Sequence, residues 1–245
     1  MAPPRREGRV AGGSQYLILM RLLILGRGKT GALVAEVARE RRHHVRVVGA
    51  QENNACSALT RETLAEIDLV IDFTTPTGVL TNIEACLREK KNMVVGTTGW
   101  HGEADRIRAA VEKAGTGFLY GPNFSIGVNL FYDIVRASAE ACRHNYHGQI
   151  FERHHHHKKD APSGTAVVLQ RIIQECGGGD LEITSFREGE VVGMHEVTFD
   201  SSADRIYLYH DAKSRKGFAE GAVLGAEWLG TRKGFFEFKD IWREL

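Results

Sequence analysis

Residues 21–42 read RLLILGRGKTGALVAEVARERR, a pattern that indicates a strand, a glycine-rich loop and a helix in succession. The first five residues form an apolar run that predicts a buried strand, and Thr30–Arg42 has the apolar spacing of a helix that buries one side. The loop between them has the spacing GxGxxG over residues 26–31. Glycines in such a turn let the backbone approach a pyrophosphate, and the helix start offers unpaired N–H groups and a positive dipole end.

A dinucleotide-binding loop is therefore expected at this position. The motif follows a strand and opens a helix, which is the context that this hypothesis requires. The alternative is a tight turn that holds no ligand. The residues expected to contact the cofactor are Gly26, Arg27, Gly28, Lys29, Thr30 and Gly31, with positive charge from the arginine and the lysine.

The same alternation of strand and helix continues to residue 120. Strands are predicted at Val45–Ala50, Ile67–Phe73, Met93–Gly96 and Gly117–Tyr120, and helices at Pro76–Lys90 and Glu103–Ala114. Short apolar strands that alternate with helices predict an α/β fold, in which helices cover both faces of a parallel sheet.

The pattern changes after Asn123. Helices are predicted at Val128–His144, Ser163–Cys176 and Phe218–Leu229, and strands at Gln149–Arg153, Leu181–Arg187, Val191–Phe199 and Arg205–His210. Strands in succession favour an antiparallel or mixed sheet, and hence a second, α+β domain. We expect a first domain over residues 20–124 and 217–245, a second over 125–216, and a disordered extension over 1–19 with Met20 as a candidate natural start.

The composition excludes several classes of protein. The 245 residues carry a formal net charge of +1, so the field of the whole molecule does not favour nucleic acid. No segment approaches the ~20 uninterrupted apolar residues of a membrane span. The four cysteines form no CxxC pair and match no zinc spacing, so we expect reduced thiols, no metal and a cytoplasmic location.

Three later segments extend the expected cofactor site. Glu52 stands 21 residues after Gly31, where an acidic residue is expected on the ribose hydroxyls; a solvated surface carboxylate is the alternative. Asparagines rather than an arginine follow it, which favours NADH slightly, with NADPH open through Arg27 or Lys29. The ends of the third and fourth predicted strands supply small polar groups for a nicotinamide, at Phe73, Thr74, Gly96, Thr97 and Thr98.

The segment ERHHHHKKDAPSGTA, residues 152–166, carries the strongest chemical signal. An imidazole titrates near neutral pH and can donate a proton, and the lysines attract an acidic substrate. Ser163 can cap the helix that follows, so that the N–H groups of Gly164 and Thr165 face a carboxylate. A metal site and a solvated charge run are the alternatives; consecutive histidines on a strand alternate faces and cannot all reach one ion.

The segment 152–166 resembles the characteristic motif of dihydrodipicolinate reductases. Other pieces agree in order: GxGxxG at 26–31, Asp72-Phe73-Thr74, Gly96-Thr97-Thr98-Gly99, residues 123–129, Arg187-Glu188-Gly189 and Gly193-Met194-His195. The resemblance covers residues 20–245. It implies a Rossmann-like dinucleotide-binding domain, rejoined by the C-terminal tail, and an α+β domain for substrate binding and association into a homotetramer.

The resemblance also implies a reaction and residue roles. NADH or NADPH would reduce a cyclic unsaturated dicarboxylate, 4-hydroxy-tetrahydrodipicolinate, to tetrahydrodipicolinate on the route to diaminopimelate and lysine. His154 would be the general acid with Lys158 as its partner, and closure of the two domains is expected. The substrate contacts would be His155, Lys158, Ser163, Gly164 and Thr165, and further nicotinamide contacts Asn123, Phe124 and Ser125.

Two departures from the family pattern bear on cofactor preference and turnover. Thr75 stands where a basic residue is common, and Met194 where an acidic residue is frequent. Two other functions stay open: a two-domain NAD(P)-dependent oxidoreductase of another small carboxylic acid, and a non-catalytic nucleotide sensor. The Asp160–Ala166 run argues against the first, and the pairing of His154 with Lys158 against the second.

Overall fold

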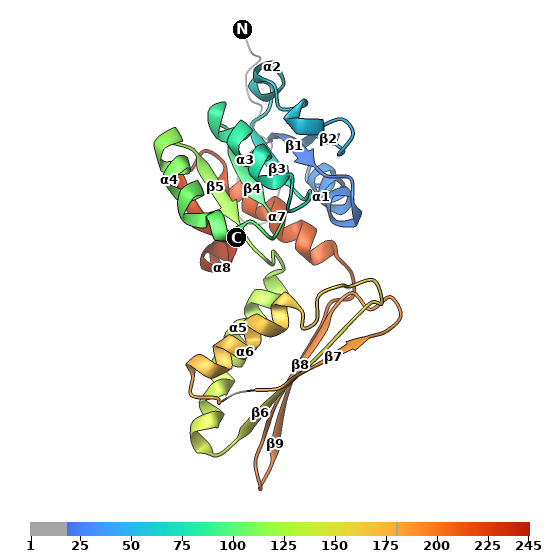
Figure 1. Cartoon of the computed structure of the whole chain (residues 1–245), viewed down its shortest axis with the longest axis vertical. Helices are drawn as coiled ribbons and strands as arrows, with labels where there is room; N and C mark the ends of the chain where they lie inside the picture. Colours follow the sequence, from blue (N-terminus) through green and yellow to red (C-terminus); the bar gives the residue numbers. More distant parts are fainter. Residues whose placement is uncertain (1–18, 180) are drawn as a thin grey trace, which may run out of the picture. The chain divides into compact units, whose positions relative to one another are not determined.

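The computed structural model describes residues 19–179 and 181–245, which form two compact units (Figure 1). The first unit contains the described residues up to Phe124 together with Phe218–Leu245, and the second contains Ser125–Gly217. The extension predicted at residues 1–19 lies outside the described residues except for Leu19. Among the described residues, none of the helices has both the length and the apolar character needed to traverse a bilayer.

The first unit is built on a parallel sheet, as predicted. Within the described residues its strand order is β10-β5-β4-β3-β1-β2, and every pair is parallel. The strands are β1 (Arg21–Leu25), β2 (His44–Val48), β3 (Leu69–Asp72), β4 (Asn92–Val95), β5 (Gly117–Tyr120) and β10 (Gly234–Glu237). The central strands β3 and β4 are buried at every residue, which explains why each has three apolar residues in a row, beside the buried polar residues Asp72 and Asn92.

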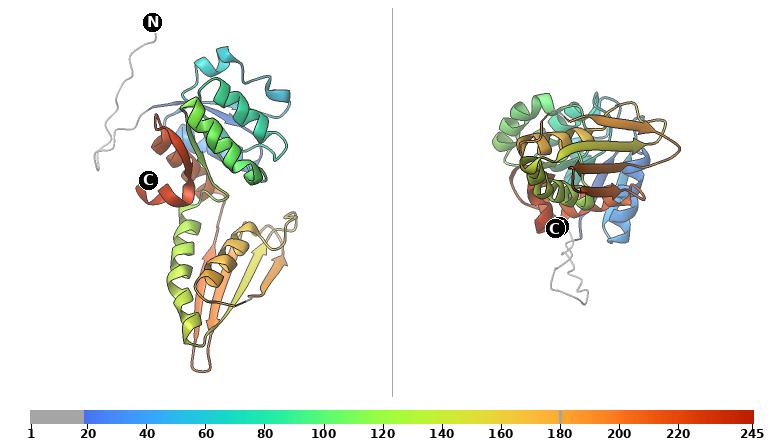
Figure 2. Two further views of the ribbon diagram at one scale, coloured as in Figure 1. Left: turned by 60° about the vertical axis from the view of Figure 1, so that its left-hand side comes forward. Right: turned by 90° about the horizontal axis from the view of Figure 1, so that it is seen from below.

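Helices cover both faces of this sheet (Figure 2). They are α1 (Lys29–Glu40), α2 (Arg61–Ala65), α3 (Val79–Arg88), α4 (Ala104–Ala114), α7 (Lys216–Leu229) and α8 (Phe238–Ile241), with short 3-10 turns η1 (Asn54–Cys56), η2 (His101–Glu103) and η4 (Trp242–Glu244). Helices α3 and α4 bury Ile83 and Val111 against one face. Helix α7 packs on the other face, where a Cβ at Gly221 would stand 1.8 Å from the Phe124 carbonyl oxygen.

Some predicted boundaries in this unit are wrong. The helix predicted from Pro76 begins only at Val79, because the preceding residues form a turn in which the N–H groups of Gly78 and Val79 donate to the Thr75 carbonyl. Strand β10 has no counterpart in the sequence prediction. It is four residues long and is stabilised by pairing with β5, a partner more than a hundred residues earlier in the chain.

The second unit has the mixed sheet that the sequence predicted as one of two options. The order is β7-β6-β8-β9, with β6 and β7 parallel and the other pairs antiparallel. The strands are β6 (His147–His154), β7 (Ile183–Arg187), β8 (Met194–Asp200) and β9 (Arg205–Asp211). Helices α5 (Ile126–Ser138) and α6 (Gly164–Glu175) lie side by side on one face (Figure 1), where Phe131, Leu169 and Phe199 belong to the core.

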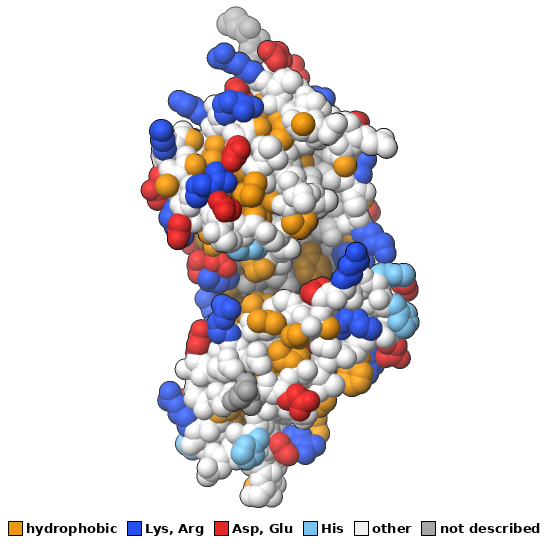
Figure 3. Space-filling view, viewed as in Figure 1, with side chains coloured by type: hydrophobic (Ala, Val, Ile, Leu, Met, Phe, Trp, Pro, Cys, Tyr) orange, Lys and Arg blue, Asp and Glu red, His pale blue; other side chains and the backbone are white. Residues whose placement is uncertain are grey.

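The helix predicted over Val128–His144 is correct only as far as Ser138. A 3-10 segment, η3 (Ala139–His144), follows it and ends at Asn145, whose φ is 62°. The other face of the mixed sheet, which we call the outer face, carries no helix within the described residues (Figure 2). Figure 3 shows acidic and basic side chains interspersed over the visible surface, in keeping with the near-zero net charge.

Candidate active site

The glycine loop has the backbone geometry of an anion-binding turn. Gly26 has a φ of 106°, and a Cβ there would stand 2.2 Å from the Phe73 carbonyl oxygen. A Cβ at Gly31 would meet the Gly26 carbonyl oxygen at the same distance, so helix and strand are packed as closely as glycines permit. At Gly28, the N-cap of α1, a Cβ would have no atom within 4 Å, and no side chain caps the helix. The start of α1 therefore faces open space and fits a pyrophosphate.

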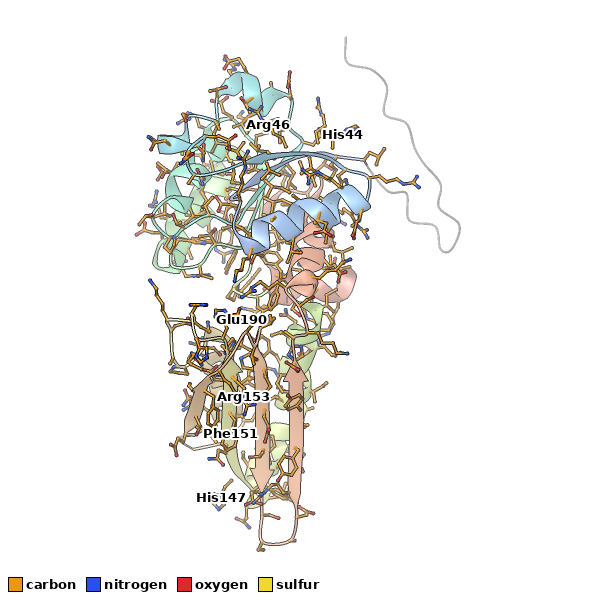
Figure 4. All side chains as sticks on the ribbon, turned by 90° about the vertical axis from the view of Figure 1, so that its right-hand side faces the viewer. His44, Arg46, His147, Phe151, Arg153 and Glu190 are labelled. Carbon is orange, nitrogen blue, oxygen red and sulfur yellow. The ribbon has the colours of Figure 1, made fainter. Side chains whose placement is uncertain are left out.

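Glu52 lies just beyond the end of β2, close to the glycine loop. Its carboxylate accepts from the Gly49 N–H at 2.8 Å and from Arg27 Nη2 at 2.9 Å. The Gly49 N–H, with the charges of Arg27 and of Arg46 on β2 (Figure 4), lowers the pKa of the Glu52 carboxyl. The structure thus brings together a carboxylate, which can accept from ribose hydroxyls, and two guanidinium groups, which can bind a phosphate.

Asp72 organises the loops at the carboxyl ends of β3 and β4. It is fully buried, and it accepts from the Thr74 N–H at 2.9 Å, from the hydroxyls of Thr74 and Thr97 at 2.7 Å each, and from Asn82 Nδ2 at 2.7 Å. The side-chain oxygen of Asn82, Oδ1, in turn accepts from Nδ2 of Asn53, in the loop after Glu52, at 2.8 Å. One buried carboxylate therefore holds the segments expected on the nicotinamide side and, through Asn82, the segment on the ribose side.

This network changes the roles expected of several predicted cofactor residues. The hydroxyl protons of Thr74 and Thr97 go to Asp72, which leaves the exposed Thr98 and the backbone as groups for a ligand in this part of the chain. The Phe73 ring packs on Gly96, and Phe124 is buried between the rings of Phe73 and Phe238.

Asn123 is half-buried in the first unit, whereas Ser125 is the first residue of the second unit. The Ser125 hydroxyl accepts from the Val128 N–H at 3.3 Å and so caps α5. Of the three residues expected on the nicotinamide at this point of the chain, one is thus in the core and one caps a helix.

In the second unit His154 lies at the end of β6 with its side chain toward the helices. Its Nδ1 donates to the carboxylate of Glu152, two residues earlier on the same face of the strand. Glu152 is fully buried, and Arg187 on β7 donates to both of its oxygens at 2.8 and 3.0 Å. Burial lowers the pKa of the His154 imidazole, and the Glu152 carboxylate opposes this effect.

The start of α6 is attached to the same carboxylate. The Ser163 N–H donates to Glu152 Oε1 at 3.2 Å, and the Ser163 hydroxyl accepts from the Ala166 N–H, as the expected N-cap does. His195 on β8 places Nε2 3.0 Å from that hydroxyl, and burial lowers the pKa of His195 to about 3. Gly164 is exposed, and a Cβ there would have open space around it, so this helix start is accessible to an anion.

The other predicted residues of this segment differ in their surroundings. Lys158 donates to both carboxylate oxygens of Asp160 at 2.8 Å, so its ammonium group already has an anionic neighbour. His155 is half-buried, and its backbone N–H donates to the Val191 carbonyl oxygen. Thr165 is half-buried in the first turn of α6. Within the described residues no cluster of three or more His, Cys, Asp or Glu side chains has the arrangement of a metal site.

Two family models together span almost the whole described chain. The model "Dihydrodipicolinate reductase, N-terminus" matches residues 20–124, and "Dihydrodipicolinate reductase, C-terminus" matches residues 127–242. The chain belongs to the dihydrodipicolinate reductase family. The resemblance inferred from residues 152–166 is therefore confirmed.

Individual members of the dihydrodipicolinate reductase family support this assignment. The 4-hydroxy-tetrahydrodipicolinate reductase of Christiangramia forsetii is 35% identical over 242 residues, covering 92% of this chain and 99% of that protein. The enzyme of the same name from Laribacter hongkongensis is 38% identical over 200 residues, covering 73% and 74%. A dipicolinate-bound dihydrodipicolinate reductase from Paenisporosarcina sp. TG-14 shares the fold, with a TM-score of 0.72, 24% identity and coverage of 91% and 99%.

Three residues that the sequence analysis did not assign to the candidate active site belong to it in the structure. Glu152, Arg187 and His195 belong to the quoted motifs, but no role was expected for them. The position of Glu152 could have been inferred, since residues i and i+2 of a strand share a face. Arg187 and His195 could not, because their neighbours depend on the strand pairs Arg187–His154 and His195–Glu152.

Proposed function

We propose that this chain catalyses the NAD(P)H-dependent reduction of 4-hydroxy-tetrahydrodipicolinate to tetrahydrodipicolinate in the diaminopimelate and lysine pathway. The observation that carries the proposal is that one buried carboxylate, Glu152, binds both the imidazole of His154 and the N–H of Ser163, the N-cap residue of α6. A proton donor and an anion-binding helix start are thereby held together, as the reduction of a dicarboxylate requires.

The first unit is the half that holds the cofactor. The open start of α1 would bind the pyrophosphate, and Glu52 would accept from ribose hydroxyls. Bound NADH or NADPH supplies the hydride. We favour NADH slightly, because Glu52 is ionised beside the loop; Arg27 and Arg46 are the groups that would admit a 2′-phosphate.

The second unit provides the acid and the binding groups for the substrate. The 4-hydroxyl group of the substrate would leave as water, which gives the conjugated ring that accepts the hydride. Protonated His154 would then donate its Nε2 proton to the ring carbon that gains electron density. The N–H groups of Gly164 and Thr165 would bind one carboxylate. Lys158 would bind the other carboxylate through the one ammonium proton that it does not donate to Asp160, with His155 beside it.

The decisive assay follows nicotinamide absorbance with freshly generated substrate from a coupled aldol-condensation enzyme. We expect turnover with NADH by the parent. We expect His154→Ala to lower kcat by about 10²–10⁴-fold with little change in KM, and Lys158→Ala to raise KM as well. Parent rates in both variants would contradict the assigned roles. Oxidation of nicotinamide only with another carboxylic acid would favour the alternative oxidoreductase, and cofactor binding without any turnover would favour a nucleotide sensor.

Cofactor preference is tested by steady-state kinetics with both nucleotides. We expect kcat/KM with NADH to equal or exceed that with NADPH. We expect Glu52→Gln to weaken the binding of NADH, because an ionised hydrogen-bond acceptor for the ribose hydroxyls is lost. A large preference of the parent for NADPH would contradict the role of Glu52. Glu36→Gln is a matched control, since Glu36 is an exposed carboxylate on α1.

We further propose that the chain functions in the cytoplasm as a homotetramer that associates through the outer face. Large rings are exposed there: Tyr207 and Tyr209 are 60% and 58% exposed, and Phe186 on β7 is also exposed. Figure 4 shows Phe151 and Arg153 along β6, whose odd-numbered residues belong to this face. Tyr209→Glu should reduce the mass in sedimentation equilibrium, whereas Leu130→Glu, on α5, should not. An unchanged tetramer in both would contradict this interface.

A further inference from the structure

The environment of Glu152 constrains which proton His154 carries. Glu152 is fully buried, and its carboxylate accepts from two guanidinium nitrogens of Arg187, from the Ser163 N–H, from the His154 ring and from the Ser185 hydroxyl. Burial alone would raise the pKa of this carboxyl, but Arg187 and the other donors outweigh it and lower the pKa to about 2. The carboxylate is therefore ionised and can only accept, so Nδ1 of His154 bears a proton at all times.

The opposite ring nitrogen has a different neighbour. Gly193, the residue just before β8, lies beside it, and a Cβ at this position would come within 3.0 Å of Nε2. The hydrogen bond at Nδ1 thus leaves Nε2 as the atom that gains and loses a proton. Nε2 lies on the side of the ring that faces Gly193, which has no side chain to cover it. The orientation and the tautomer of the ring are both set from within the second unit.

We propose that Glu152, held in turn by Arg187, is a positioning residue that fixes the Nδ1–H tautomer of His154 and supports its protonated form. This inference rests on the proposed function of His154 as the acid. It gives a functional role to the buried ion pair of Glu152 and Arg187. Buried ion pairs in general contribute little net stability to a fold.

The charges around His154 show why the support is needed. Arg187 on β7 and Lys158 in the loop after β6 disfavour an imidazolium, and burial disfavours it further. His195 on β8 is kept neutral by burial and rests on Ser163 at the start of α6. His210 on β9 is opposite His195 and has a pKa lowered by burial, so it stays neutral and adds no positive charge. Asp160 compensates Lys158 directly. Glu152 is the carboxylate in contact with the ring.

The test replaces the carboxylate by a neutral amide of the same shape. In Glu152→Gln the amide NH₂ can donate to Nδ1, which favours the other tautomer and opposes protonation. We expect kcat at pH 7 to fall about 10- to 100-fold, as for the loss of general acid catalysis. We also expect the fall of kcat with rising pH to move at least one pH unit lower, while the dissociation constant for NADH stays constant. Glu188→Gln removes an exposed carboxylate next to Arg187 in sequence, and it should change neither kcat nor the pH dependence of kcat.

Two further measurements separate positioning from a merely structural role. In a His154→Ala background, Glu152→Gln should cost less than about twofold in kcat, because the two residues act as one unit. Nitrogen NMR of histidine-labelled protein should show an Nδ1–H tautomer for His154 in the parent and an Nε2–H tautomer in Glu152→Gln. The NMR result does not depend on turnover, so it tests the inference even if the proposed acid role of His154 fails.

The opposite results are equally specific. An unshifted pH profile, an unchanged tautomer, or an equal loss of kcat in both backgrounds would overturn the inference. Glu152→Asp is the second variant in case Glu152→Gln does not fold. It keeps the charge for Arg187 but withdraws it from Nδ1, and we expect the same shift of the pH profile with a smaller loss of kcat. A parental pH profile and kcat in Glu152→Asp would also overturn the inference.

Discussion

Replacing Gly193 by alanine tests how closely the reacting nitrogen of His154 is placed. The added methyl carbon would lie 3.0 Å from Nε2 and 3.3 Å from Cδ2, whereas ordinary contacts begin at 3.4 Å and extend to 4 Å. The ring must therefore move by about 0.4 Å to reach ordinary van der Waals contact. Glu152 resists this movement because it holds the other side of the ring, so the strain stays in the site.

A misplacement of about 1 Å can cost about 100-fold in rate, so we expect the smaller displacement in Gly193→Ala to lower kcat about 5- to 10-fold. Overpacking should also lower the free energy of unfolding by about 1–3 kcal/mol. Stopped-flow kinetics at saturating substrate and urea unfolding measure the two effects. Gly102→Ala is the control, since a Cβ there meets no atom within 4 Å. Parental kcat in a folded Gly193→Ala protein would refute the placement of Nε2.

Three further predictions concern other buried groups. Asp72→Ala should weaken NADH binding in a fluorescence titration and lower the urea-unfolding free energy by about 2–4 kcal/mol, because several donors lose their acceptor; exposed Asp105→Ala is the control and should change neither. Glu227→Gln should cost about 2–3 kcal/mol of that free energy, because Glu227 binds Arg41 at 2.6 Å and His43 at 2.8 Å; an unchanged unfolding midpoint would contradict it. Burial lowers the pKa of His195 from 6.5 to about 3, so between these pH values the imidazole is protonated in the unfolded chain but neutral in the folded protein. The free energy of unfolding should therefore fall as the pH drops from 6.5 towards 3. Urea denaturation at several pH values should show a smaller fall of this free energy in His195→Gln.

The sequence predicted the parallel sheet well because its signals are local. The run Leu22–Leu25 is apolar without interruption since helices cover both faces of the strand, and the glycine loop follows directly. Strand β10 was not predicted, since its four residues carry no periodic signal and depend on pairing with β5. The helix after Ser125 was predicted too long, because residues 139–144 keep a helical composition while the chain tightens into a 3-10 turn.

The same division applies to the candidate site. The chemical groups could be read from the sequence, because the glycine loop (26–31) and the segment 152–166, with its imidazole and ammonium groups and the capped start of α6, are each continuous in the chain. The protonation states and hydrogen-bond partners of these groups depend on the folded structure. The register between β6, β7 and β8 brings Arg187 and His195 to Glu152 and His154. Glu152, which selects the tautomer of His154, is only two residues away from it, but Arg187 keeps Glu152 ionised, and His195 contacts Ser163. Both of these contacts join residues more than thirty positions apart in sequence.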